Sequence, residues 1–323
     1  MNAPLLEVRG LSTQFPTRTG LVKAVNDVSF FVRRGEILGL VGESGSGKSV
    51  TGFSLIGLID PPGRIAGGAV LLEGRDLVGL PASDLRAIRG KRISMVFQDP
   101  SMTLNPVLTV GAQMRLALEA HAGGSGREAR ARSVAALARV GIPDPARRLD
   151  AYPHQFSGGM RQRIAIAIAL LHQPDLIIAD EPTTALDVSI QAQILAEMKT
   201  LARDSGTALI WISHDLATIS AMADRIAVMY AGRIVESGPT GTVLRDPRHP
   251  YTRGLLDSLP AMAEAGADLA SIPGTTPALD RLPPGCPFAP RCFKAQPECA
   301  SEPPEVAQGG RSFRCHFPLG AAA

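Results

Sequence analysis

A run of glycine, serine and lysine near the N-terminus has the residue types and spacing that bind phosphate. It matches the pattern G-x-x-x-x-G-K-S/T, in which glycines allow a tight turn and let phosphate oxygens approach the backbone. The lysine would reach the β- and γ-phosphates of a nucleotide, and the final serine would ligate Mg²⁺. The residues of this phosphate loop are Gly42, Glu43, Ser44, Gly45, Ser46, Gly47, Lys48 and Ser49.

The elements on either side of the loop decide between a nucleotide site and a glycine-rich turn that fits the pattern by chance. Residues 36–41 are mainly aliphatic and predict a buried strand. Residues 50–59 predict a helix, which Pro61 and Pro62 would end. A strand, a glycine loop and a helix point several backbone N–H groups and a helix N-terminus at one spot. This context favours a nucleotide site.

Carboxylate and amide side chains follow two further apolar runs. Residues 92–97 predict a strand that ends at Gln98, and residues 176–179 predict one that ends at Asp180 and Glu181. In an α/β sheet such strand ends lie at the edge where ligands bind. Asp180 would help to hold Mg²⁺ and Glu181 would polarise the attacking water, while Gln98 is a candidate for either the Mg²⁺ or that water. The alternative is a pair of strands that end in solvated polar turns.

Three other features are weaker signals of the same site. His214 follows the apolar residues 208–212, and its place at a strand end favours a γ-phosphate contact over the usual structural role of a lone histidine. Phe15 precedes a polar turn, where it could stack on a base or simply end a strand. Ser157-Gly158-Gly159 opens a predicted helix, and its exposed N–H groups could form an anion site or a plain N-cap.

Length and composition bound the class of protein. A chain of 323 residues, 45% of them hydrophobic, can bury a sizeable core in one large domain plus a smaller one, or in two modest domains. Its net charge of +3 does not by itself indicate nucleic acid. The N-terminus lacks the pattern of a signal peptide, and the apolar runs are too short to span a bilayer. We therefore expect a cytosolic chain that is peripheral to a membrane through a partner.

In this order, the motifs resemble the ATP-binding subunits of ABC transporters over residues 5–260. The resemblance implies a signature turn that contacts ATP, Ser157 to Gln162, and a further nucleotide contact at Asp187. The signature has Phe156 and Met160 where Leu and Gln are usual, which is similar to the dipeptide/oligopeptide importer branch. The implied fold is an α/β, P-loop ABC-type ATPase core with an antiparallel β subdomain, an inserted helical subdomain and a C-terminal extension that contains cysteines.

This resemblance also implies domains, partners and a location. Residues 1–240 would form the nucleotide-binding domain, with the helical subdomain at about 100–172, and residues 241–323 the extension. Two ATPase subunits would close head to tail around two ATP molecules, and the partner in this branch is often a distinct homologous subunit. Two transmembrane permease subunits and, indirectly, an extracytoplasmic solute-binding protein would complete the importer. The chain would then lie at the cytoplasmic face of the inner or plasma membrane.

All the cysteines lie in the last 38 residues, in the spacing C-x5-C-x6-C-x15-C. Zinc sites usually have closer cysteine pairs, and four thiolates can instead hold an iron–sulfur cluster. Some members of the peptide-importer branch resemble this arrangement and hold a [4Fe-4S] cluster. We therefore expect a [4Fe-4S] cluster, with Zn²⁺ and free structural thiols as alternatives, and His316 as a less favoured replacement ligand. The expected ligands are Cys286, Cys292, Cys299 and Cys315.

Two rival functions remain open. The imported solute could be glutathione, a nickel chelate or another small molecule instead of a peptide, because the permease and the binding protein select it. The chain could also be a soluble ABC ATPase that acts on ribosomes or DNA. Such proteins commonly carry two ATPase cassettes or a long coiled coil, whereas this sequence has one phosphate loop and no heptad run. The importer, without a nucleic-acid partner, is therefore the favoured hypothesis.

Overall fold

The computed structural model describes residues 3–18, 20–121, 125–183, 188–260 and 270–320. Its contacts divide the chain into two compact units. The first unit contains Met1–Arg33, Ile37–Gly79 and Trp211–Ala323. The second unit contains Arg34–Glu36 and Leu80–Ile210. The phosphate loop and the cysteines therefore belong to the first unit, and the Gln98, Asp180 and signature segments to the second.

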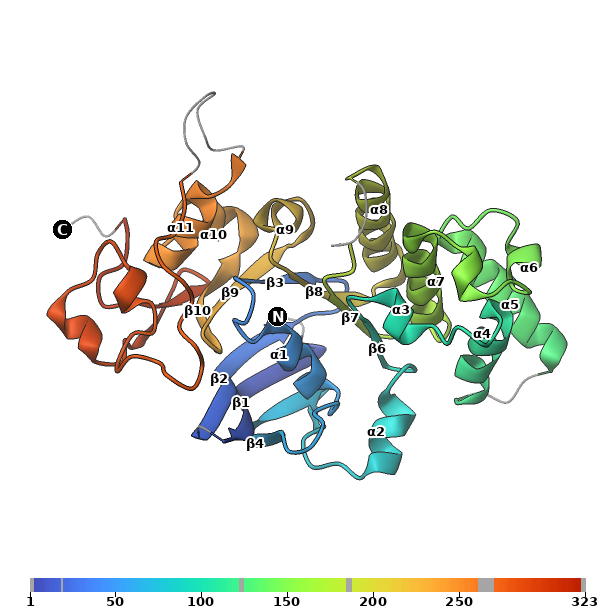
Figure 1. Ribbon diagram of the computed structural model, residues 1–323, viewed down its shortest axis with the longest axis horizontal. Coiled ribbons are helices and arrows are strands. Elements are labelled where there is room, and N and C mark those ends of the chain that lie inside the picture. The colour runs from blue at the N-terminus through green and yellow to red at the C-terminus, as the bar shows by residue number, and fades with distance from the viewer. Residues whose placement is uncertain (1–2, 19, 122–124, 184–187, 261–269, 321–323) are drawn as a thin grey trace. The chain divides into compact units, whose positions relative to one another are not determined.

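An antiparallel sheet forms one part of the first unit (Figure 1). Apolar residues such as Leu6, Val8 and Val28 are buried, because alternate residues of each strand face the same side of the sheet. The sequence predicts a turn from 16 to 20, whereas the strands extend to Thr17 and resume at Gly20. In sheet order the strands are β2 (Gly20–Val32), β1 (Leu6–Thr17), β4 (Arg64–Leu72) and β5 (Arg75–Asp76).

A second group of strands in the first unit positions the phosphate loop. The central strand β3 (Ile37–Val41) is buried throughout and pairs in parallel with β9 (Arg225–Tyr230). β9 continues into the antiparallel strand β10 (Arg233–Pro239), as the hairpin signal at Ala231-Gly232 predicts. The helices of this unit are α1 (Lys48–Leu55), α9 (Leu216–Met222), α10 (Thr240–Arg245) and α11 (Pro250–Asp257).

The C-terminal extension adds structure that the proline-rich sequence does not suggest. Strand β12 (Arg311–Arg314) pairs with β10, and β11 (Glu305–Gln308) pairs with β12, so the tail extends the sheet of the first unit. Two short 3-10 helices, η3 (Ala289–Arg291) and η4 (Pro297–Ala300), lie among the cysteines. A domain boundary at residue 240 stays a prediction, because the tail belongs to the same unit as the phosphate loop.

The second unit contains a parallel strand pair and most of the helices. β6 (Ile93–Val96) pairs in parallel with β7 (Leu176–Asp180). β8 (Ala208–Ser213) begins in this unit and ends in the first. The helices expected at 110–121 and 127–140 are present within two residues of those bounds, because their apolar positions repeat at helical spacing. The helices are α2 (Ala82–Ile88), α3 (Pro100–Thr103), α4 (Val110–Glu119), α5 (Gly126–Arg139), α6 (Pro145–Arg148), η1 (Pro153–Gln155), α7 (Gly158–Leu170) and α8 (Val188–Ser205).

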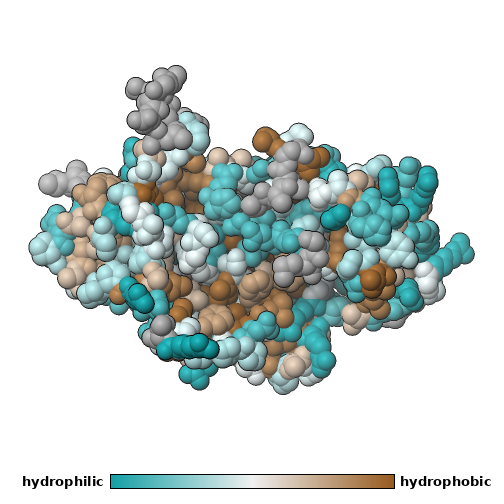
Figure 2. All heavy atoms as spheres, in the orientation of Figure 1, coloured by the Kyte–Doolittle hydropathy of each residue, from teal (hydrophilic) through white to brown (hydrophobic). Residues whose placement is uncertain are grey.

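None of the helices in the described part of the chain is long and apolar enough to cross a membrane. Hydrophilic and hydrophobic residues are interspersed over the face shown in Figure 2.

Candidate active site

The phosphate loop joins β3 to α1 and requires glycine at two of its positions. Gly42 has φ of 155°, and a Cβ atom there would lie 2.2 Å from the carbonyl oxygen of Met229. Gly47 has φ of 102°, and a Cβ atom there would lie 2.3 Å from the carbonyl oxygen of Ala24. A larger residue would therefore push the loop away from neighbouring strands. The two glycines explain how the loop stays close to β9 and β2 while its backbone turns sharply.

Lys48 lies folded over this loop. Its side chain is almost completely buried, with 5% of the residue exposed. The ammonium group Nζ donates to the carbonyl oxygens of Gly42 at 2.8 Å and Glu43 at 3.0 Å, and approaches the Ser46 hydroxyl at 3.5 Å. An ammonium group held against the backbone of this loop is suited to bind phosphate oxygens.

The helix behind the loop adds to the anion site. α1 begins at Lys48, and its N-cap, Gly47, has no side chain that could occupy the first N–H groups. Such N–H groups and the positive end of the helix dipole attract anions. Ser44 and Gly45 are exposed at the outer edge of the loop, while Ser46 is buried and Ser49 half-buried. The described geometry is thus that of a phosphate cradle.

Phe15 and His214 also belong to the first unit. Phe15 is half-buried in β1, and its ring packs against Gly63, where a Cβ atom would lie 2.3 Å from the ring. His214 is exposed directly after β8. The next residue, Asp215, caps α9 by accepting hydrogen bonds from the Ala217 N–H group at 2.9 Å and the Thr218 hydroxyl at 2.5 Å. The cap holds the turn that carries His214, and the roles expected for Phe15 and His214 stay predictions.

In the second unit, the strand-end carboxylates and the Gln98 amide lie together. Asp180 ends β7 and is 3% exposed. Glu181 follows it with φ of 44°, a left-handed backbone conformation that is uncommon outside glycine and often occurs at functional sites. The Gln98 Nε2 atom donates to Glu181 Oε2 at 3.2 Å. The proximity follows from the parallel pairing of β6 and β7, which brings their carboxyl ends to one edge.

The signature segment forms the beginning of α7. Ser157 is its N-cap, and the Ser157 hydroxyl accepts a hydrogen bond from the Met160 N–H group at 3.4 Å. Ser157 and Gly158 are exposed and Gly159 is half-buried, so the first turn of the helix is accessible. Gln162 is instead 2% exposed, and within the described residues its amide atoms have no hydrogen-bond partner. Asp187 lies outside the described residues.

Two residues far from the phosphate loop in sequence contact the loop at Glu43, and none of these three residues has a role of its own predicted from the sequence. Glu43 stands at a variable position of the loop pattern, while Tyr251 and Arg291 belong to the C-terminal part of the chain. A hydrogen bond from the Arg291 guanidinium holds the pKa of Glu43 below its ordinary value and raises the pKa of Arg291. Burial raises the pKa of the Tyr251 hydroxyl, which accepts a hydrogen bond from the Glu43 N–H group. Only the long-range fold brings these groups together.

The four cysteines of the tail line one small cavity, and all of them are free thiols. Burial raises the pKa of Cys286 and Cys292, and raises the pKa of Cys315 to about 11. Across the described ranges, no group of three or more His, Cys, Asp or Glu side chains has the arrangement of a metal-ion site. The cysteines therefore converge as the sequence suggests, and the metal cluster stays a prediction.

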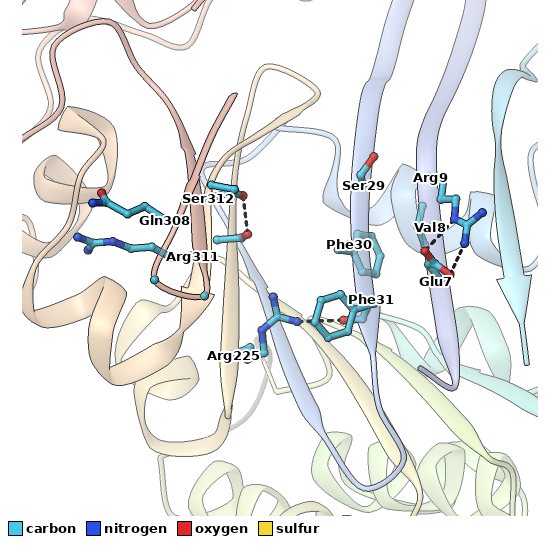
Figure 3. Close-up of a pocket in the computed structure, with 14 residues that line it drawn as sticks. Glu7, Val8, Arg9, Ser29, Phe30, Phe31, Arg225, Gln308, Arg311 and Ser312 are labelled. Atoms are coloured by element: carbon cyan, nitrogen blue, oxygen red, sulfur yellow. Dashed lines mark hydrogen bonds and ion pairs between the residues drawn. The ribbon is translucent and has the colours of Figure 1, made fainter. Parts of the chain in front are cut away.

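Another hollow in the first unit, a groove of about 500 Å³, lies between strands of its two sheets (Figure 3). The Arg9 guanidinium binds the Glu7 carboxylate, and the Arg225 guanidinium lies over the Phe31 ring, 4.1 Å from its centroid. Arg225 also donates to the Phe31 carbonyl oxygen at 3.3 Å. The Arg9–Glu7 pair lies within β1, whereas the contacts of Arg225 with Phe31 join β9 to β2 across the groove.

Comparisons with known proteins agree with this geometry. The family model described as ABC transporter matches residues 25–184, and the model described as oligopeptide/dipeptide transporter, C-terminal region, matches residues 235–299. The dimeric ATP-binding cassette MJ0796, solved with bound ADP and Pi, superposes with a TM-score of 0.66 at 27% identity. This match covers 73% of the present chain and 98% of the cassette.

Curated relatives extend the similarity over nearly the whole chain. A protein of Brucella abortus (strain 2308), named as a peptide import ATP-binding protein, is 52% identical over 97% of this chain and 95% of its own length. The oligopeptide transport ATP-binding protein OppD of Salmonella typhimurium is 49% identical over 98% of this chain and 94% of its own length. This chain therefore belongs to the family of ABC transporter ATP-binding proteins, in the branch that carries the oligopeptide/dipeptide transporter C-terminal region.

Proposed function

We propose that this ABC ATPase energises the import of dipeptides or oligopeptides. The observation that carries the proposal is the coexistence of a phosphate cradle, in which Lys48 covers the loop, with the C-terminal region of the peptide-transporter branch. Relatives that are 52% and 49% identical in sequence to this chain are named for peptide import and oligopeptide transport, respectively. The first feature supports ATP binding, and the second supports the solute class.

Each residue of the candidate site would have its own role in ATP binding or hydrolysis. Lys48 and the loop N–H groups would bind the β- and γ-phosphates, and Ser49 and Asp180 would hold the Mg²⁺ that neutralises them. Glu181 would accept a proton from the attacking water, and its hydrogen bond from Gln98 keeps the carboxylate oriented. His214 would contact the γ-phosphate. The accessible first turn of α7, at Ser157-Gly158-Gly159, would bind the γ-phosphate held by a second ATPase subunit.

The proposed assembly follows from these roles. A turn that acts on another subunit's ATP requires a homologous ATPase, which we infer to be a distinct chain. Residues 99–106 of this chain, beside Gln98, would pass the conformational change on to two transmembrane permease subunits. An extracytoplasmic solute-binding protein would deliver the peptide. The chain would then be a peripheral protein of the cytoplasmic membrane face.

Transport in reconstituted vesicles tests the solute class. The chain, its partner ATPase and the permease would be placed in liposomes with the binding protein, and uptake of labelled di- to pentapeptides would be followed with ATP. We expect ATP-dependent peptide uptake that Glu181→Gln abolishes. Uptake of glutathione or a nickel chelate without peptide uptake would refute the peptide assignment and leave the ATPase intact. Recovery of ribosomes or DNA with the purified chain, instead of permease subunits, would refute the importer.

We also propose that the tail binds a [4Fe-4S] cluster through Cys286, Cys292, Cys299 and Cys315. Four free thiols around one cavity are the donor set that such a cluster takes. The cysteines are separated by five or more residues, whereas zinc sites usually have cysteine pairs separated by two to four. The cluster would hold the tail together as a cross-link between its loops.

Spectroscopy and metal analysis test the cluster independently of transport. The chain would be purified without oxygen, and iron, sulfide and zinc would be measured on the sample that gives the visible spectrum. About four irons per chain with a broad band near ~400 nm would support the cluster. One zinc and no iron would refute it and make the tail a zinc-bound structural element. If the sample contains neither iron nor zinc, the cysteines are structural thiols without a bound metal.

A further inference from the structure

The C-terminal extension is hydrogen-bonded to Glu43, the second residue of the phosphate loop. Arg291 donates from Nη1 and Nη2 to the two carboxylate oxygens of Glu43, at 2.6 and 3.0 Å. The Thr276 hydroxyl donates to the same carboxylate at 2.8 Å. A paired guanidinium and carboxylate joined by two hydrogen bonds fix orientation as well as distance. The tail therefore determines where the Glu43 side chain lies.

Arg291 is itself firmly held. Its side chain is 5% exposed, and Nε donates to the carbonyl oxygen of Pro273 at 2.9 Å. Nη1 also approaches the Tyr230 hydroxyl at 3.4 Å. A buried guanidinium needs its anionic partner, because an unpaired charge inside a protein is strongly destabilising. Arg291 ends η3, between Cys286 and Cys292, so the cysteine-bearing segment carries the residue that grips the loop.

The backbone of Glu43 passes this constraint to Lys48. The Glu43 N–H group donates to the Tyr251 hydroxyl at 2.8 Å, and the Glu43 carbonyl oxygen accepts from Lys48 Nζ at 3.0 Å. Tyr251 is fully buried, with its ring centroid 4.6 Å from that of Tyr230 and 5.3 Å from that of Phe288. The side chain, the N–H group and the carbonyl oxygen of Glu43 are thus each hydrogen-bonded. The partner of the carbonyl oxygen is Lys48, the lysine proposed to bind phosphate.

We propose that Arg291 is a positioning residue for ATP: through Glu43 it holds the phosphate loop in the shape that places Lys48. This role goes beyond the transport function and rests only on ATP binding at the loop, not on the solute or on a metal at the cysteines. The competing account is electrostatic. In that account Arg291 merely neutralises a carboxylate that would otherwise repel the phosphates of ATP.

Nucleotide affinity of the full-length chain separates the two accounts. The Kd for a fluorescent ATP analogue with Mg²⁺ would be measured for Arg291→Met, Glu43→Met and the double variant, after melting curves establish that each is folded. Positioning predicts that each single change weakens binding about tenfold, and that the double change is no worse than either alone, because one contact is lost in all three. The electrostatic account predicts that Glu43→Met binds ATP as well as or better than the parent, and that the double variant regains its affinity.

Turnover and a matched control complete the test. In the assembled transporter, Arg291→Met should raise KM for ATP about tenfold and leave kcat within about twofold, because the contact acts on binding. Arg291→Lys keeps the charge without the two-bond geometry and should fall between the parent and Arg291→Met. Arg311→Met removes another tail guanidinium, 8% exposed and paired with Asp246, and should leave ATP affinity unchanged. Parental affinity in Arg291→Met, or restored affinity in the double variant, would overturn the proposal. If a single variant does not fold, the double variant decides, because it leaves no buried charge unpaired: weakened ATP binding supports positioning, and parental affinity overturns it.

Discussion

Substituting alanine at two glycines of the phosphate loop isolates the cost of close backbone packing. Gly47 and Gly45 both have positive φ, 102° and 77°. A Cβ atom at Gly47 would lie 2.3 Å from the carbonyl oxygen of Ala24, whereas at Gly45 nothing lies within 4 Å. The two substitutions therefore share the backbone strain and differ in the steric clash.

The magnitudes follow from these two contributions. The unfavourable φ costs about 1–2 kcal/mol at either position. The clash at Gly47 cannot be relieved by turning a side chain, because the atom met is a backbone oxygen, and overpacking of this kind adds about 1–3 kcal/mol. We therefore expect Gly47→Ala to destabilise the chain by about 2–5 kcal/mol and Gly45→Ala by about 1–2 kcal/mol.

Thermal unfolding checks the difference. At about 2–4 °C per kcal/mol for a unit of this size, Gly47→Ala should lower Tm by several degrees more than Gly45→Ala. ATP affinity measured on the same samples should fall further in Gly47→Ala, since the clash displaces the loop from its strand. Equal losses of Tm in the two variants would show that the contact with Ala24 does not constrain the loop, and the steric argument would then be wrong.

Three further outcomes are expected. Glu181→Gln should lower kcat about 10²–10⁴-fold while ATP still binds, measured as phosphate release beside nucleotide affinity, and parental turnover would exclude Glu181 as the base. Asp215→Ala removes the cap of α9 and should cost about 1 kcal/mol in thermal unfolding, with a higher KM for ATP if the cap holds His214 in place. Burial lowers the pKa of His172 from its ordinary 6.5, so the unfolded chain takes up a proton more readily and stability should fall as pH drops below about 6.5. Urea midpoints at pH 7.5 and 5.5 should differ less in His172→Gln, and an unchanged difference would contradict this assignment.

Much of the candidate site could be predicted from local sequence. The phosphate loop and the strand ends at Gln98 and Asp180 were identifiable because short patterns dictate strand, turn and helix within a few residues. The adjacency of Gln98 and Glu181 also followed, since parallel strands place their carboxyl ends at one edge. Asp187 lies outside the described residues, and its role stays a prediction.

Other features had no local signal. Gln162 falls within the signature pattern, yet the helix turns its side chain inward. The tail reads as proline-rich loops, but one of its segments, β12, pairs with the edge of β10, and a second, β11, pairs with β12. Such strand pairing depends on which sheet edge lies near the tail in the folded chain, and no sequence pattern within the tail predicts that.

The sequence by itself therefore determined the local geometry of the loop and of the strand ends, and from it predicted which residues bind phosphate, hold Mg²⁺ and activate water, because spacing along the chain sets local geometry. The tertiary structure alone decided how that chemistry is supported. Glu43 and Arg291 stand 248 positions apart, and neither belongs to a recognisable motif with the other. Their contact arises only when the fold brings the tail against the phosphate loop, where burial makes a paired charge far more stable than an unpaired one.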